Sequence, residues 1–114
     1  MRLRSTVAAA LAAAALVLTL PASAEAAQGQ FSYVFHDRSG GSQFGVIDNP
    51  PSHECLTLPE TRHDFTPPAD SPRNSTEATA EVFTGVDCTG DVFRLRPFGE
   101  RASERLKLRS VRFL

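Results

Sequence analysis

The stretch Phe83-Thr84-Gly85-Val86-Asp87-Cys88-Thr89-Gly90 predicts a folded β-hairpin around which the rest of the chain is organised. One strand is expected to end near Phe83, and the next is expected to begin near Asp91. Gly90 supplies the positive φ that a residue with a Cβ atom adopts only at a cost. We expect Phe83 to lie over the turn as its cover and Cys88 to tie the turn to the rest of the fold.

Residues 83–114 resemble the Greek-key motif of the βγ-crystallin family, through Phe83-x4-Cys88-x-Gly90 and the alternating strands that follow. In that family an aromatic, a second aromatic and a glycine stand at this spacing. A serine of the last strand closes over the hairpin, and Ser110 holds that position. Cys88 replaces the second aromatic, which suggests that a disulfide takes the place of the ring.

The resemblance also bears on calcium, because the positions of the family's calcium signature fall on residues 105–110. No carboxylate stands there, so calcium binding is not expected, and neither another metal nor a cofactor is predicted. The first half of the chain holds no clean copy of the motif. Whether it is a degenerate second Greek key stays open.

The first 26 residues have the three parts of a secretory signal peptide: a charged start, an apolar core over residues 7–20 and small residues at the end. This apolar stretch is shorter than the roughly 20 residues that a membrane-spanning helix needs. The alternative to a cleaved signal peptide is a membrane anchor that is retained. Cleavage after Ala26 is favoured over cleavage after Ala24. It would leave residues 27–114 as one small domain, secreted and without a membrane span.

Cys55 and Cys88 are the two cysteines of the chain. An even number of cysteines in a small exported domain predicts a disulfide. The alternative, two free thiols in a redox or metal pair, lacks a Cys-x-x-Cys spacing. A cross-link over this loop would contribute about 3–4 kcal/mol, which is comparable with the net stability of a small domain.

Short alternating segments separated by Gly/Pro turns predict an all-β fold, a small Greek-key sandwich of the βγ-crystallin type. The segment Pro59–Thr76 holds four prolines and few large apolar residues, and is predicted to be a long loop. Residues 102–105 are expected to form one helical turn, and a break is expected at Ser110. The predicted strands are residues 31–36, 43–47, 54–58, 78–84, 91–96, 106–109 and 110–113.

No pattern in the chain indicates catalysis. A Gly-x-Ser-x-Gly elbow is absent from the sequence, and no pair of carboxylates is marked by its surroundings. The three histidines, His36, His53 and His63, lack the spacing of a zinc motif and are expected to be exposed turn residues. We therefore expect a protein that is not an enzyme.

Two segments are candidate binding sites. The basic residues near the C-terminus could form one face for an anionic cell-surface polymer, or could simply pair with acidic residues of residues 27–91. Nucleic acid is not the expected partner, because no aromatic residues alternate with the arginines. These basic residues are Arg94, Arg96, Lys107, Arg109 and Arg112.

The Pro59–Thr76 loop is the second candidate, because a stiff exposed loop near a disulfide loses little entropy on docking. Secreted bacterial βγ-crystallin-like proteins include metalloprotease inhibitors and toxin-like proteins, so the resemblance permits an inhibitor; a mobile spacer is the alternative. The single lysine against 11 arginines and the alanine-rich leader suggest a GC-rich bacterial source, of actinobacterial type. The prediction is a secreted, monomeric, non-enzymatic binding or structural protein, whose partner is an extracellular protein or an anionic polymer.

Overall fold

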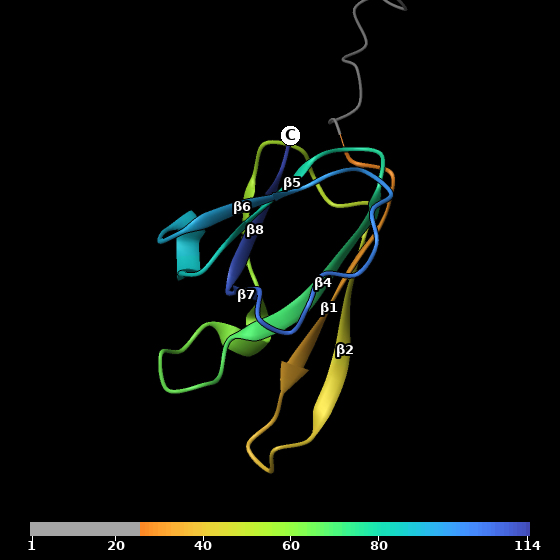
Figure 1. The fold of residues 1–114 in the computed structure, drawn as a ribbon. Helices are drawn as coiled ribbons and strands as arrows, with labels where there is room; N and C mark the ends of the chain where they lie inside the picture. The colour runs from red at the N-terminus through yellow and green to blue at the C-terminus, as the bar shows by residue number, and fades with distance from the viewer. Residues whose placement is uncertain (1–25) are drawn as a thin grey trace, which may run out of the picture.

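Two four-stranded antiparallel sheets pack face to face in the computed structural model, which describes residues 26–114 (Figure 1). The predicted signal peptide, residues 1–26, therefore lies outside the described residues apart from Ala26. The prediction of an all-β fold is confirmed. Within residues 26–114 the only helical pieces are two short 3₁₀ turns, η1 (Pro59–Thr61) and η2 (Val86–Cys88). No helix among these residues is long and apolar enough to cross a membrane.

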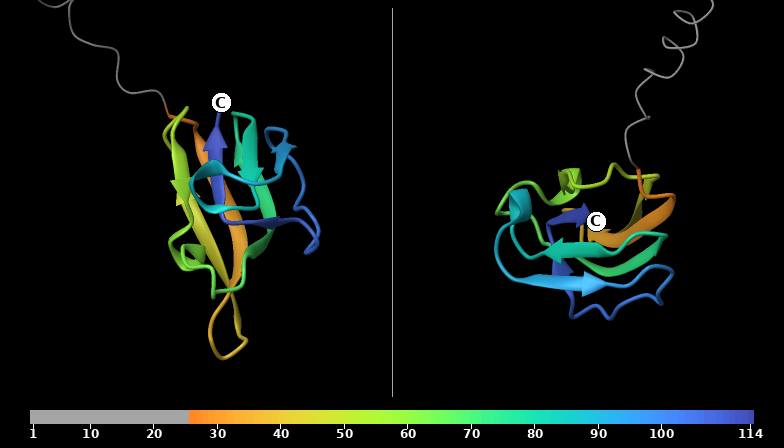
Figure 2. Two further views of the ribbon diagram at one scale, coloured as in Figure 1. Left: turned by 90° about the vertical axis from the view of Figure 1, so that its left-hand side faces the viewer. Right: turned by 90° about the horizontal axis from the view of Figure 1, so that it is seen from above.

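The two sheets share strands between the two halves of the chain (Figure 2). The order of the first sheet is β2-β1-β4-β7, and that of the second is β3-β8-β5-β6. Each half of the chain thus places three of its four strands in one sheet. The strand that comes third along each half, β3 or β7, belongs to the other sheet. The strands are β1 (Gly29–His36), β2 (Ser42–Asp48), β3 (Cys55–Thr57), β4 (Ala69–Thr76), β5 (Ala80–Phe83), β6 (Val92–Leu95), β7 (Lys107–Leu108) and β8 (Ser110–Phe113).

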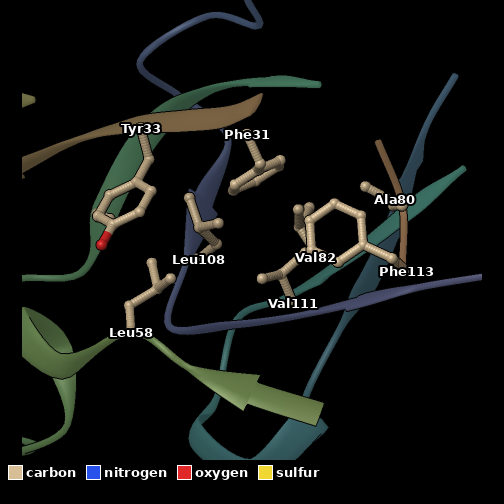
Figure 3. Packing of buried hydrophobic residues seen from close by; sticks show 10 residues of the cluster. Phe31, Tyr33, Leu58, Ala80, Val82, Leu108, Val111 and Phe113 are labelled. Carbon is tan, nitrogen blue, oxygen red and sulfur yellow. The ribbon is translucent and has the colours of Figure 1, made fainter. Parts of the chain in front are cut away.

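The core lies between the sheets and is built by alternate residues of strands from both halves (Figure 3). Phe31 of β1 and Phe113 of β8 meet edge to face, with ring centroids 5.4 Å apart. Since both rings are fully buried, this contact joins the first and second sheets at the centre of the molecule. The other large members of the cluster are Tyr33, Leu58, Val82, Leu108 and Val111.

The prediction of a loop over Pro59–Thr76 is wrong for its second part, because Ala69–Thr76 forms β4 in the interior of the first sheet. Pro72 cannot donate to a ladder, yet it is fully buried in this strand. A register shift solves the conflict. The pairing with β1 shifts between Ser32 and Val34, so residues 71 and 72 form a bulge.

Asn74 of β4 is buried, and each of its polar side-chain atoms has a hydrogen-bond partner. Its amide nitrogen donates to the carbonyl oxygens of Ala78, Leu95 and Arg96 at 2.7–3.2 Å. Its oxygen accepts from the backbone N–H and the hydroxyl of Thr76. A buried amide with these bonds costs little, and it connects β4 to the end of β6.

The folded hairpin stands where the sequence predicts it. β5 ends at Phe83, η2 follows, and Gly90 has a φ of +83°. The hydroxyl of Ser110 accepts from the N–H of Cys88 at 2.9 Å and donates to the carbonyl of Gly85 at 2.6 Å. The expected contact of Ser110 with the hairpin is therefore present. Phe83 is 8% exposed, although it lies outside the central cluster.

The predicted disulfide between Cys55 and Cys88 is confirmed, with its Cα atoms 6.0 Å apart. It links β3, which comes from the first half of the chain, to η2 in the second half. The bond thus fixes β3, the strand of the first half that belongs to the second sheet.

The chain breaks near the expected position but for a different reason. β7 ends at Leu108 and β8 begins at Ser110, so the backbone changes sheets at Arg109 rather than bulging within one strand. The predicted helical turn over residues 102–105 is absent. A turn closed by the bond from the N–H of Leu106 to the carbonyl of Ser103 stands there instead.

Candidate binding site

The part of the predicted loop that remains outside regular structure, residues 62–68, is held in place by Arg109. One nitrogen of its guanidinium donates to the carbonyls of Thr61 and His63, at 2.8 and 3.0 Å. The other donates to the carbonyl of Thr66 at 2.8 Å. A planar group with several donors suits this task, because one side chain fixes three points of the backbone.

The tip of this segment is a tight turn that presents an aromatic side chain. The N–H and the hydroxyl of Thr66 both donate to the carbonyl of His63. The rings of His63 and Phe65 are stacked, with centroids 5.1 Å apart. Phe65 remains 73% exposed. A side chain this exposed adds little to the core and is available for contact with a partner.

The turn between β1 and β2 lies at the same end of the molecule as residues 62–68 (Figures 1 and 2). The carboxylate of Asp37 organises this turn by accepting from the N–H groups of Ser39 and Gly41 and from the hydroxyl of Ser39. These hydrogen bonds, that of Ser39 first, lower the pKa of Asp37. The carboxylate is therefore an anion at neutral pH.

A cleft of about 460 Å³ separates the two segments. Its size is within the range of small-ligand sites, about 300–1,000 Å³. Glu60 lies in its wall and accepts a 2.7 Å hydrogen bond from the hydroxyl of Tyr33. Burial and this carboxylate both raise the pKa of Tyr33, so the phenol stays protonated. The residues that line the cleft are Phe35, His36, Asp37, Arg38, Glu60, Phe65, Thr66 and Pro67.

His36 connects the cleft to the first sheet. Its Nε2 lies 2.6 Å from the carboxylate of Asp70, and its Nδ1 lies 3.1 Å from the hydroxyl of Ser42. Burial alone would raise the pKa of Asp70, but the hydrogen bonds from His36 and Ser71 and the charge of Lys107 lower it. The buried carboxylate is thereby kept ionised.

The Ser42–His36–Asp70 chain has the residue types of a hydrolase triad without the rest of its machinery. An acyl-transfer site also needs free N–H donors for the oxyanion. The N–H groups of Gly40 and Gly41, which precede Ser42, are bonded to Asp37. The geometry therefore favours a structural role for this chain, which closes the end of the β1–β2 hairpin.

The basic residues predicted to form one face are divided among different partners. Arg94 and Arg112 flank the buried carboxylate of Glu81, at 3.3 and 2.7 Å. The hydrogen bond from Arg112 lowers the pKa of Glu81 against the effect of burial. Lys107 lies 3.7 Å from Asp70 in the other sheet.

The remaining two basic residues also lie apart from each other. Arg109 binds the backbone carbonyls of the 61–66 segment, as described above. Arg96 lines a separate shallow hollow together with Asn74 and Glu100. The five cations thus divide into an ion-paired group, a structural arginine and a rim residue.

No group of three or more His, Cys, Asp or Glu side chains among residues 26–114 is arranged to hold a metal ion. Comparisons of the chain with family models, with curated protein sequences and with solved structures found no match. The function therefore has to be argued from the site itself.

Proposed function

We propose that the protein is a secreted, non-enzymatic binding protein of the βγ-crystallin type, and that it binds a protein partner through the end formed by residues 62–68 and the β1–β2 turn. The observation that carries this proposal is the set of three carbonyl contacts made by Arg109. They fix the turn on which Phe65 is exposed. A segment ordered before docking loses less entropy when it binds.

The crystallin-type assignment is supported by topology and by one contact. The exchange of β3 and β7 between the sheets makes two interlocked four-strand units, which fits the Greek-key motif suggested by residues 83–114. The two hydrogen bonds of Ser110 to the hairpin fit the role of the serine in that motif. The first half, on this proposal, is the degenerate second motif.

Secretion is supported by the leader and by the disulfide. Disulfides persist in oxidising compartments outside the cytosol. Intact mass of the protein recovered from culture medium tests this part of the proposal. The expected product begins at Ala27 and is two hydrogen atoms lighter than its reduced form. A product that retains residues 1–26, or that stays in the cytosol, would contradict it.

A protein partner is favoured over an anionic polymer because three of the five basic residues predicted to form a face are ion-paired. Arg94, Arg112 and Lys107 have carboxylates as neighbours, which reduces the positive charge that these residues offer to a polyanion. A secreted protease is the partner class that the resemblance suggests. The tight turn at 63–66 is not the extended backbone of a substrate, so we expect it to block access from the rim of an active site.

Two phenylalanines give a matched test. Phe65 and Phe98 are 73% and 71% exposed, but only Phe65 lies on the proposed binding end. The purified protein is tested for inhibition of, and binding to, a panel of secreted proteases and the extracellular proteins of the source organism. Phe65→Ala is expected to weaken binding at least tenfold, and Phe98→Ala to leave it unchanged. Equal effects of both variants, or binding that falls steeply with salt, would contradict the proposal.

A further inference from the structure

The cleft beside Phe65 combines aromatic walls with carboxylates, and this combination indicates what it would take. Phe35 and Phe65 belong to its lining, as do the carboxylates of Glu60 and Asp37. Aromatic rings with nearby carboxylates favour a flat cation, which can stack on a ring and form hydrogen bonds in its own plane. Among protein side chains, the guanidinium of arginine has this shape.

We propose that this cleft receives an arginine side chain of the protein partner, which stacks against Phe35 and Phe65 and pairs with Glu60. This inference rests on the proposed function and adds the chemistry of the contact. Glu60 uses Oε1 to accept from Tyr33. Within residues 26–114 no donor is bonded to its other oxygen, which is left for the partner.

Two arginines of this protein already lie over phenylalanine rings. The guanidinium of Arg101 lies 5.1 Å from the ring centroid of Phe44, and that of Arg112 lies 5.8 Å from the ring of Phe83. Arg112 at the same time forms two hydrogen bonds to Glu81. A guanidinium between an aromatic ring and a carboxylate is therefore an arrangement that occurs within this fold.

Substitutions of Arg38 and of Glu60 are expected to have opposite effects on the binding of arginine. Arg38 lines the same cleft and carries a like charge, so it opposes the entry of a cation. Removing it should strengthen binding of arginine, whereas removing the charge of Glu60 should weaken it. The amide oxygen introduced by Glu60→Gln can still accept the hydrogen bond of Tyr33, so this variant is expected to fold.

The test is a titration of the ¹⁵N-labelled protein with three capped tripeptides that carry arginine, citrulline or lysine between two glycines. Citrulline has the shape of arginine without its charge. The arginine peptide is expected to shift the amide signals of residues 35–38, 60, 65 and 66 with a Kd in the millimolar range, and citrulline to bind about tenfold more weakly. Lysine, which lacks the planar group, is expected to fall between them.

The variants decide whether Glu60 and Arg38 act as stated. Glu60→Gln is expected to weaken binding of the arginine peptide about five- to tenfold, and Arg38→Gln to tighten it about two- to threefold. Glu100→Gln, in the separate hollow, is the matched control and should change nothing. Equal binding of arginine and citrulline, no shift with any peptide, or no effect of Glu60→Gln would overturn the inference.

The inference and the proposed function can fail separately. If the partner binds independently of Phe65 while the cleft still takes the arginine peptide, the proposed function is wrong, and of the inference only the preference of the cleft for arginine stands. If the partner needs Phe65 but binds equally well to the Glu60→Gln variant, only the arginine contact is wrong.

Discussion

Replacing Arg109 by lysine tests whether this side chain holds residues 62–68 in their conformation. Lysine keeps the charge, but its single nitrogen cannot take the places of both guanidinium nitrogens, so it loses either the bond to Thr66 or the two bonds to Thr61 and His63. A hydrogen bond from a charged donor contributes about 1.5–3 kcal/mol, and partial exposure puts these bonds at the lower end. The loss of one or two bonds, which are not additive, should lower the free energy of local opening by about 2 kcal/mol.

Chymotrypsin cleavage measures that opening directly. Cleavage after Phe65 requires the turn to open, and 2 kcal/mol corresponds to about a 30-fold faster cut, because 1.4 kcal/mol is a factor of ten. Phe98 has nearly the same exposure and serves as an internal reference within the same chain. The fragments are distinguished by mass. Arg105→Lys, at an exposed position, is the control variant.

The quantity compared between variants is the rate of cleavage after Phe65 divided by the rate of cleavage after Phe98. We expect it to rise about 30-fold in Arg109→Lys and to stay constant in Arg105→Lys. A ratio that does not change in Arg109→Lys, with global stability checked by urea unfolding, would refute the role assigned to Arg109. The proposed binding end would then lose its main support.

Three further outcomes concern stability, all measured by urea unfolding. Replacing both Cys55 and Cys88 by serine should lower the free energy of unfolding by about 3–4 kcal/mol, from the 33-residue separation of the cysteines; a loss below about 1 kcal/mol would contradict this. Ser110→Ala should cost about 1–3 kcal/mol, because the N–H of Cys88 and the carbonyl of Gly85 lose their partner; an unchanged midpoint would remove the assigned role. The pKa of Asp70 is lowered in the folded state despite burial, so its stabilising effect is present above the unfolded value of about 3.9 and is lost as the pH falls below it. Asp70→Asn should therefore be less stable at pH 7 and have a flatter pH dependence between pH 5 and 2, whereas parallel curves would contradict the assignment.

Strands with local apolar alternation could be predicted from the sequence, since Phe31 and Tyr33, like Ala80 and Val82, face the core in the expected period. β4 could not be predicted in this way. Its sequence is Ala-Asp-Ser-Pro-Arg-Asn-Ser-Thr, which has no apolar stripe and contains a proline. Its burial depends on carbonyl groups near residues 78 and 95 that complete the hydrogen bonds of Asn74.

The two halves of the chain have the same arrangement of strands but share no sequence pattern, for a physical reason. In the second half, Ser110 of β8 bonds to the backbone of the hairpin. In the first half the corresponding turn is closed by the side chain of Asp37, and β4 reaches it through the pair Asp70–His36. Different side chains thus hold a similar place in the topology, so the two halves share no sequence pattern.

The candidate site was predicted only in outline. The prolines of residues 59–76 predicted a stiff exposed segment, and residues 62–68 fit this description. Arg109 was predicted to lie on a basic outer face, whereas its guanidinium turns toward backbone carbonyls. Which carbonyls a long side chain reaches depends on contacts across the sandwich, and these are not local in sequence. The cleft depends in the same way on Phe35 and Phe65 from two distant segments.

The position of β8 between β3 and β5 has a consequence for how the polypeptide reaches its native state. Residues 110–113 form this inner strand, so until they are available β3 has no partner strand and β5 has only β6. During synthesis from the amino end, the second sheet would therefore stay incomplete until residues 110–113 emerge. Because pairing between strands far apart in sequence is slow to form, the closing of this sheet is expected to be a late step of folding.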